Sequence, residues 1–151
     1  MVRAFSLPSE SLSYFIGFAL LHSDEVAIVS PWLSDVELRL PVNDRFERRT
    51  VSLVDAVNEL EETTVHFIVR EGESHNEYIR KRLPRQQHLH EVDDLHAKAI
   101  VTDTFVYVGS ANITRGGLTV NRELCELLEN EFETVEAYLA TKLELSVTLE
   151  T

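Results

Sequence analysis

Cysteine is nearly absent from this chain, which has Cys125 and no other among its 151 residues. An intrachain disulfide and an all-cysteine metal site within one chain are therefore excluded. A single thiol favours a reducing compartment, so we expect a cytoplasmic protein. Long hydrophobic runs are also missing: the longest mostly apolar run, residues 12–21, contains Ser13 and is too short to span a bilayer. No basic segment precedes that run, so we expect no signal peptide.

Proline and glycine are scarce, with four and five residues. The chain has no internal repeat and no Pro/Gly/Ser-rich linker, so residues 1–151 are expected to form a single domain. Hydrophobic residues make up 44% and charged residues 26% of the chain. These are the proportions of a globular protein, and they exclude a wholly disordered chain.

Lysine is depleted, since the 14 basic residues comprise eleven arginines and only three lysines. With 26 acidic residues, the formal net charge is −12. This balance resembles that of proteins from a high-salt cytoplasm, although an ordinary acidic domain can have it too. It argues against broad electrostatic attraction to nucleic acid. A local basic cleft stays open, because salt screens each charge beyond about 8 Å at physiological ionic strength.

Helical and strand-like segments alternate along the chain. Apolar residues at helical spacing predict helices at 9–21, 53–60 and 131–143, and the capping-box spacing of Ser74 and Glu77 predicts a short helix closed by Pro84. Apolar or alternating runs predict strands at 26–29, 36–42, 65–69 and 123–128, with short strands between 87 and 108. The alternating residues 145, 147 and 149 predict an edge strand or an interface tail. Helices interleaved with strands indicate an α/β layered fold.

The residues that carry chemistry are concentrated between positions 95 and 126. On a strand, His96 and Lys98 would share one face, while Leu95, Ala97 and the apolar residues that follow would fill the other. An imidazole beside an ammonium suits an anionic substrate, because the lysine holds the charge and the histidine attacks or transfers a proton. A carboxylate on a later strand, Glu123, is available to orient the imidazole.

A short hydrophobic strand leads from this pair into a second group of polar residues. Gly109 lets the backbone come close to a ligand, and the Ser110 hydroxyl and Asn112 amide can donate to phosphate oxygens. Nearby, Arg115 and Arg122 are candidates for substrate contact.

Taken together, these residues form a recognisable pattern: His96-x-Lys98-x4-Asp103, followed by Gly109-Ser110-x-Asn112. It resembles the HKD motif of the phospholipase D superfamily, and Asn121-x-Glu123 is similar to the acidic position that often follows it. The resemblance implies a three-layer α/β/α sandwich with a mixed central sheet.

The chain has one such motif, whereas the double-motif lipases of that family build one site from two. It therefore resembles the single-motif members, which include nucleases that assemble the site across a homodimer. The resemblance implies that His96 of one subunit attacks phosphorus and that His96 of the partner subunit protonates the leaving oxygen. Lys98 and Asn112 would hold the phosphoryl oxygens with help from Ser110, and Glu123 would orient His96.

The same resemblance gives Asp103 a role that is more structural than chemical, and it implies no metal ion or other cofactor. The motif is therefore expected to work with side chains alone.

Weaker features allow both a structural and a functional interpretation. His88 and His90, with Asp93, Asp94 and His96, suggest a metal cluster, but their order favours ordinary strand or surface histidines. Two basic runs, at 80–85 and 45–49, face either phosphates or solvent. Trp32, which follows Ser30-Pro31, serves either packing or base stacking.

The leading hypothesis is a metal-independent nuclease or related phosphodiesterase that acts on DNA or RNA as a homodimer. One alternative is a phospholipid-acting phosphodiesterase or transferase, which the lack of an evident amphipathic helix with a basic face disfavours. Another is a non-catalytic nucleic-acid-binding or assembly module, which the complete motif disfavours.

Overall fold

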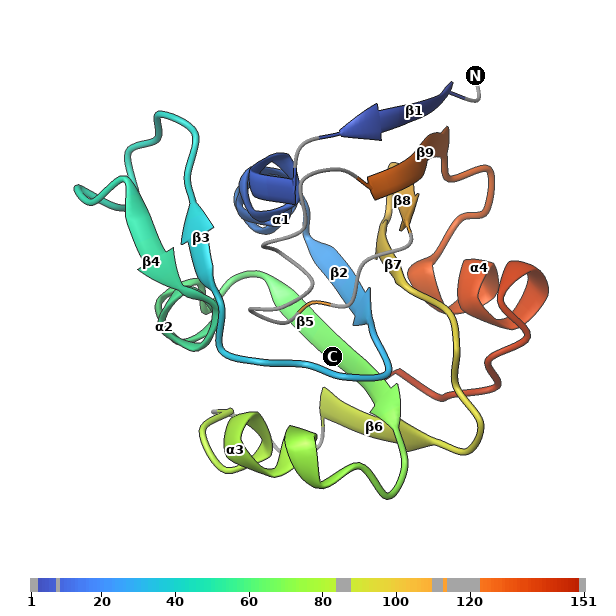
Figure 1. Ribbon diagram of the computed structural model, residues 1–151. Coiled ribbons are helices and arrows are strands. Elements are labelled where there is room, and N and C mark those ends of the chain that lie inside the picture. The colour runs from blue at the N-terminus through green and yellow to red at the C-terminus, as the bar shows by residue number, and fades with distance from the viewer. Residues whose placement is uncertain (1–2, 8, 84–87, 110–112, 114–122, 150–151) are drawn as a thin grey trace.

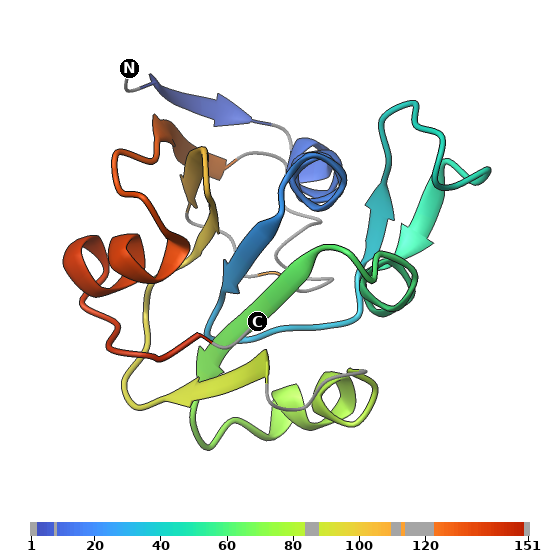
Figure 2. The ribbon, with the colours of Figure 1, turned by 180° about the vertical axis from the view of Figure 1, so that it is seen from behind.

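The computed structural model describes residues 3–7, 9–83, 88–109, 113 and 123–149, with the backbone alone for 3–7, 9–11 and 123–125. A mixed sheet lies between two helical layers: α1 and α2 cover one face, and α4 covers the other (Figure 1). The view from behind shows the same three layers (Figure 2). The predicted three-layer α/β/α architecture with a mixed central sheet is confirmed.

The central sheet has seven strands within the described residues, in the order β1-β9-β8-β7-β2-β5-β6. The pairing changes from antiparallel to parallel at strand β2, which pairs antiparallel with β7 on one side and parallel with β5 on the other. The bounds are β1 (Arg3–Leu7), β2 (Glu25–Val29), β5 (Thr64–Arg70), β6 (Leu89–Val92), β7 (Ala99–Thr102), β8 (Phe105–Gly109) and β9 (Glu123–Glu129). A separate hairpin pairs β3 (Glu37–Arg39) with β4 (Thr50–Ser52).

The described helices are α1 (Ser9–His22), α2 (Leu53–Glu59), α3 (Glu77–Arg80) and α4 (Val135–Lys142), and a 3₁₀ turn, η1 (Ser74–Asn76), precedes α3. Side-chain caps begin two of them: the Ser52 hydroxyl accepts from Asp55 N before α2, and the Thr134 hydroxyl accepts from Ala137 N before α4. None of the described helices is long and apolar enough to cross a membrane.

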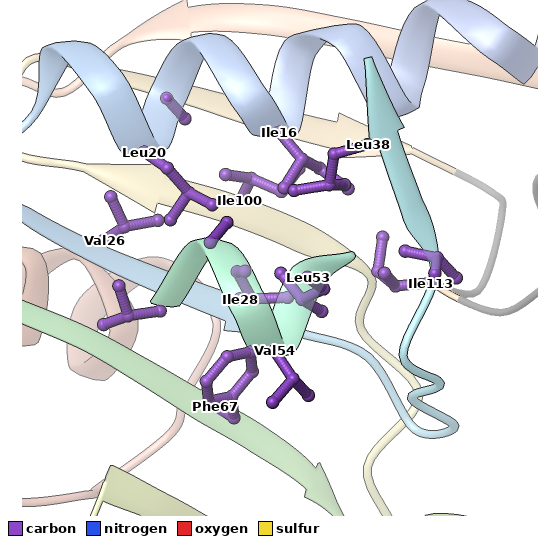
Figure 3. Packing of buried hydrophobic residues seen from close by; sticks show 14 of the residues in the cluster. Ile16, Leu20, Val26, Ile28, Leu38, Leu53, Val54, Phe67, Ile100 and Ile113 are labelled. Atoms are coloured by element: carbon purple, nitrogen blue, oxygen red, sulfur yellow. The ribbon is translucent and has the colours of Figure 1, made fainter. Parts of the chain in front are cut away.

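Each face of the sheet carries its own hydrophobic core. The larger core joins α1, α2 and the β3–β4 hairpin to residues such as Ile28, Phe67 and Ile100 (Figure 3). The smaller core joins α4 to Leu95, Ala99 and the alternate residues of the same strands. Helix α1 lies very close to the hairpin at Gly17, where a Cβ atom would be 2.8 Å from the Arg39 carbonyl oxygen. Only glycine fits this contact without moving the backbone.

Most predicted elements are confirmed, although several bounds differ. The helix predicted at 131–143 begins only at Val135, because Thr134 caps it. The capping box of Ser74 and Glu77 is wrong: neither η1 nor α3 has a side-chain cap. The strand predicted at 36–42 is reduced to residues 37–39 and belongs to the separate hairpin.

The two ends of the chain also differ from expectation. Strand β1, which the sequence analysis missed, pairs with β9 at an edge of the sheet. The predicted edge strand at 145–149 is wrong, because that segment forms no ladder. It packs instead on the α4 core, with Leu145 buried and Leu149 N donating to the Glu136 carboxylate.

A buried histidine of β5 lies next to the start of β6. The His66 ring is completely buried, with its centroid 4.6 Å from that of His88 and 5.6 Å from that of His90. Its Nε2 atom is 3.8 Å from a carboxylate oxygen of Glu25. Burial, helped by the two neighbouring imidazoles, lowers the pKa of His66 to about 4.

This histidine should make stability depend on pH. The unfolded chain binds a proton near pH 6.5 and the folded chain near pH 4, so stability falls as the pH drops through this window. The full difference is on the order of 3 kcal/mol. Urea unfolding from pH 7 to pH 4 should show this loss in the wild type and a flatter profile in His66→Gln. The exposed-histidine control, His22→Gln, should follow the wild type; a His66→Gln profile parallel to it would contradict the assignment.

Candidate active site at the edge of the central sheet

The candidate site lies at a row of strand ends, where β2 and β8 end and β7 and β9 begin. We call this row of strand ends the sheet edge. Val29, the last residue of β2, pairs with Ala99, the first residue of β7. Ala99 in turn pairs with Val108, and Gly109 pairs with Cys125 near the start of β9. This register brings the backbone of the His96–Lys98 segment, Gly109 and Glu123 to the same edge. The sheet topology therefore brings these three backbone segments to one place, although they are far apart in sequence.

His96 and Lys98 lie just before β7 and not within a strand, which corrects the prediction. The alternation of faces still holds, because Leu95 and Ala99 are buried in the α4 core. The His96 side chain is 71% exposed. The Lys98 ammonium donates to the His96 carbonyl oxygen at 3.1 Å, so the lysine folds back along its own segment. An exposed imidazole and an ammonium at this edge can meet an anionic substrate directly.

Both ring nitrogens of His96 have a partner. Arg70 Nη2 is 3.3 Å from Nδ1, and an Asp94 carboxylate oxygen is 3.0 Å from Nε2. A guanidinium has no acceptor, so Arg70 donates and Nδ1 accepts. The proton of the neutral ring is then on Nε2, where it is donated to Asp94. In this arrangement neither nitrogen offers a free lone pair to a phosphorus atom.

Arg70 is itself held in place at the end of β5. Its Nε donates to the Leu95 carbonyl oxygen at 2.8 Å, and its Nη1 donates to the Glu73 carboxylate at 3.1 Å. Asp94 is less constrained, since its side chain is 86% exposed. Its backbone has a φ of 55°, in the left-handed region that aspartate and asparagine tolerate better than most residues.

A buried hydroxyl joins the end of β2 to the segment that follows the second half of the motif. Ser30 Oγ accepts from Ile113 N at 3.0 Å and donates to the Trp32 carbonyl oxygen. Ile113 is buried and forms a parallel bridge with Leu33, and its carbonyl oxygen accepts from Ser34 N at 2.9 Å. The residue next to Asn112 in the chain is therefore fixed to the same sheet edge as His96.

The structure gives a reason for glycine at position 109 that the sequence did not suggest. A Cβ atom there would lie 2.7 Å from the Tyr107 hydroxyl oxygen. Tyr107 is buried, so the close approach that glycine allows is to this ring. Gly109 N also donates to the Lys98 carbonyl oxygen at 3.1 Å, which extends the β7–β8 pairing up to the lysine of the motif.

Asp103 lies apart from the other motif residues. It follows β7, whereas His96 precedes it, so the two are seven positions apart along mostly extended chain, roughly 20 Å. Burial raises the pKa of the Glu25 carboxyl at that end of the sheet, and the negative charge of Asp103 adds to this effect. Asp103 thus lies at the opposite end of the sheet from His96, and its role stays a prediction.

The remaining predicted site residues fall outside the described part of the chain. These are Ser110, Asn112, Arg115 and Arg122, and for Glu123 the backbone alone is described. Their roles stay predictions.

Three arginines of the two basic runs form ion pairs within the protein. Arg48 pairs with Glu59 at 3.2 Å and Arg45 with Glu62 at 3.8 Å. Arg80 pairs with Glu77 and Glu91. These contacts favour the interpretation as solvated faces over phosphate binding.

The histidines near the motif do not gather around one point. His88 and His90 lie against His66, whereas His96 contacts Asp94 and Arg70. In the part of the chain that the structure describes, no group of three or more His, Cys, Asp or Glu side chains is arranged to hold a metal ion.

Arg70 was missed by the sequence analysis, and Asp94 was considered only as a metal ligand. Arg70 lies 26 positions before His96, and no local motif connects it to the histidine. The signal that could have found it is topological: a charged residue at the end of a predicted buried strand, at the edge where β2 ends.

Comparisons with known proteins agree with this architecture. The family model described as "Cardiolipin synthase, PLD-like domain" matches residues 23–144. The fold is similar to that of Nuc from Salmonella typhimurium, a phospholipase D family member, with a TM-score of 0.62 and 16% identity over 95% of this chain and 92% of that one. NucT from Helicobacter pylori has a TM-score of 0.56 and 16% identity, with coverage of 95% and 96%.

A larger enzyme shares the fold over part of its length. Phosphatidylserine synthase from Haemophilus influenzae has a TM-score of 0.56 and 13% identity, and the match covers 95% of this chain but 37% of that one. No curated protein matches the chain. The family model spans most of the sequence and includes every residue of the HKD pattern from His96 to Glu123. The chain therefore belongs to the phospholipase D-like family.

Proposed function

We propose that this protein is a metal-independent phosphodiesterase that cleaves nucleic acid, as a single domain over residues 1–151, in a site shared by two copies of the chain. The observation that carries the proposal is the exposed His96 imidazole beside Lys98 at the sheet edge. A nucleophile and a cation side by side suit attack on an anionic phosphodiester. The fold also matches nearly the full length of Nuc, a phospholipase D family member, and of NucT.

The proposed reaction has two displacements at phosphorus. His96 attacks the phosphorus atom, a P–N bond forms, and the P–O bond to the leaving strand breaks. His96 of the partner subunit, as imidazolium, gives its proton to the leaving oxygen. The same imidazole then removes a proton from water, the resulting hydroxide attacks phosphorus, and the P–N bond breaks to regenerate His96. Covalent catalysis of this kind replaces one difficult displacement with two easier ones.

The other motif residues hold charge and geometry in this proposal. Lys98 and Asn112 bind the non-bridging phosphoryl oxygens, and Ser110 assists. Glu123 orients His96 by accepting a hydrogen bond from its Nδ1–H group. The resting contacts of the isolated chain must then change, since Arg70 donates to Nδ1 and Asp94 accepts from Nε2. An incoming phosphate favours that change, because it repels the Asp94 carboxylate from the ring.

Lipid phosphodiesters are the second candidate substrate, and the family model's description favours them. Against them, α1 (SESLSYFIGFALLH) has no lysine or arginine, so it lacks the basic face of a helix that binds anionic membranes. An assay on single-stranded DNA, duplex DNA, RNA and a phospholipid separates the two. Turnover of the lipid alone would overturn the proposed nuclease.

Cleavage should survive removal of metal ions, because the proposed chemistry uses imidazole and ammonium groups. We expect the same initial rate on an oligonucleotide with and without EDTA. A magnesium-dependent nuclease in the same buffer serves as the control and should lose its activity. Loss of cleavage on chelation, with recovery on adding one divalent ion, would contradict the mechanism.

The shared site predicts that one defective subunit disables the pair. His96→Ala and Lys98→Ala should each abolish turnover, since each change removes a group twice from the composite site. A purified heterodimer of tagged wild-type and His96→Ala subunits has one of the two required imidazoles, so it should be inactive or stall before hydrolysis. Half of the wild-type rate in that heterodimer would mean that each chain holds an independent site.

Asp94 competes with the substrate for His96 in this arrangement, so removing its charge should improve substrate binding. Asparagine tolerates the left-handed backbone at this position. An exposed charge contributes about 0.2–1 kcal/mol, so Asp94→Asn should lower KM about 1.5- to 5-fold with little change in kcat. The neighbouring exposed carboxylate gives the matched control, Asp93→Asn, whose KM should move less. A large fall in kcat for Asp94→Asn would instead give Asp94 a direct part in the reaction.

A further inference from the structure

Aromatic rings gather beside the candidate site, where the chain leaves β2. Trp32 is 42% exposed and Tyr78 is 57% exposed, which makes them two of the few large apolar residues at the described surface. The Trp32 and His75 rings are stacked, with centroids 5.5 Å apart and an angle of 19° between the planes. We call Trp32, His75 and Tyr78 the aromatic platform.

Buried and polar contacts hold the platform in place. The Asn76 side chain, 2% exposed, accepts from Leu33 N at 2.8 Å and donates to the Pro31 carbonyl oxygen at 2.9 Å. It thereby ties η1, which carries His75, to the segment that carries Trp32. His75 Nε2 is hydrogen-bonded to the Ser34 hydroxyl at 2.9 Å. The rings are therefore ordered before any ligand binds, which reduces the entropy lost on binding.

The platform is linked to His96 indirectly, through Pro31 and Arg70. Arg70 N donates to the Pro31 carbonyl oxygen at 3.2 Å, and the Arg70 guanidinium contacts His96 Nδ1. Trp32 follows Pro31 in the chain, so Arg70 lies between the platform and the catalytic histidine. A ligand on the platform would extend toward the reacting centre.

The hollow next to the rings suits a base better than a phosphate. It has a volume of about 310 Å³ and is lined by Leu33, Ser34, Asp35, His75 and Tyr78. The Asp35 carboxylate repels a phosphate but accepts hydrogen bonds, and one of its oxygens already accepts from Val54 N. The Arg82 guanidinium lies 3.6 Å from the Tyr78 ring centroid, so it covers one face of this ring. A hollow lined by two rings, a leucine and the polar side chains of Ser34 and Asp35 suits a base, which stacks on rings and forms hydrogen bonds.

The charge of the protein makes stacking more valuable here. With a net charge of −12, the chain attracts a polyanion poorly, so affinity must come from contacts that do not depend on charge. Stacking on aromatic rings supplies such affinity, and it requires bases whose faces are not covered by neighbours in a duplex.

We infer that the aromatic platform binds unpaired bases of a single-stranded nucleic acid and delivers the adjoining phosphodiester to His96. This inference deepens the proposed function and rests on it. Trp32, His75 and Tyr78 then give the protein a preference for single strands over duplexes.

The single tryptophan of the chain makes the test direct, because all tryptophan emission comes from Trp32. His96→Ala protein, which does not cleave, is titrated with a short oligothymidylate, with an abasic oligonucleotide of the same length and with a duplex. The oligothymidylate should quench the emission saturably, and the abasic strand and the duplex should not. Equal quenching by the abasic strand, or no quenching, would overturn the inference.

Substitutions then separate the platform from the chemistry. Trp32→Ala and Tyr78→Ala should each weaken binding of a labelled oligothymidylate roughly 5- to 150-fold, the range expected for one lost base stack. They should raise KM on single strands and leave hydrolysis of a small phosphodiester unchanged. The matched control is Phe18→Ala, which removes a 37% exposed ring that packs near Phe105 at the other end of the sheet.

The outcomes distinguish this inference from the proposed function. Cleavage of single strands with unchanged KM in Trp32→Ala and Tyr78→Ala would overturn the platform and leave the nuclease intact. Quenching by oligothymidylate without cleavage of any phosphodiester by the wild type would overturn the proposed function while supporting the platform. A blue shift of Trp32 emission on anionic vesicles, with no response to oligothymidylate, would overturn the platform in favour of a lipid surface.

Discussion

The fully buried hydroxyl of Ser30 is the contact on which the candidate site most depends. It accepts from Ile113 N and donates to the Trp32 carbonyl oxygen, so one side chain fixes two segments that are 83 positions apart. Leaving such a buried hydroxyl or amide without a partner would be unfavourable by about 1–3 kcal/mol. The two segments are therefore held in one relative position. Ile113, the residue after Asn112 in the chain, and Trp32 of the aromatic platform are both held at the end of β2 by this oxygen.

Strand β2, which precedes Ser30, also explains the position of the candidate site. Because β2 pairs in parallel with β5 and antiparallel with β7, the end of β5 and the beginning of β7 meet at one edge. Arg70 comes from the first and His96 from the second. Arg70, from the parallel part of the sheet, thereby controls the tautomer of His96, which comes from the antiparallel part.

Much of this was predictable from sequence, and the failures have physical reasons. The layered fold followed from periodicity, and the site from the spacing of His96, Lys98 and the residues after Gly109. Strand β1 was missed because its pairing with β9 joins residues about 120 positions apart, and nothing local signals it. Arg70 was missed for the same reason. The capping box failed because Asn76 serves the Pro31–Leu33 segment, so a tertiary contact decides the local structure.

The pairing of β1 with β9 has a consequence for the order in which the protein is made. Residues 3–7 are synthesised about 120 positions before their partners, residues 123–127. Strand β1 therefore has no neighbour in the sheet until β9, the strand that carries Glu123, has been made. Contacts of such long sequence separation also form slowly in refolding, because the intervening chain must be ordered first. The pairing of β9 with β1 is thus one of the late steps in completing this sheet.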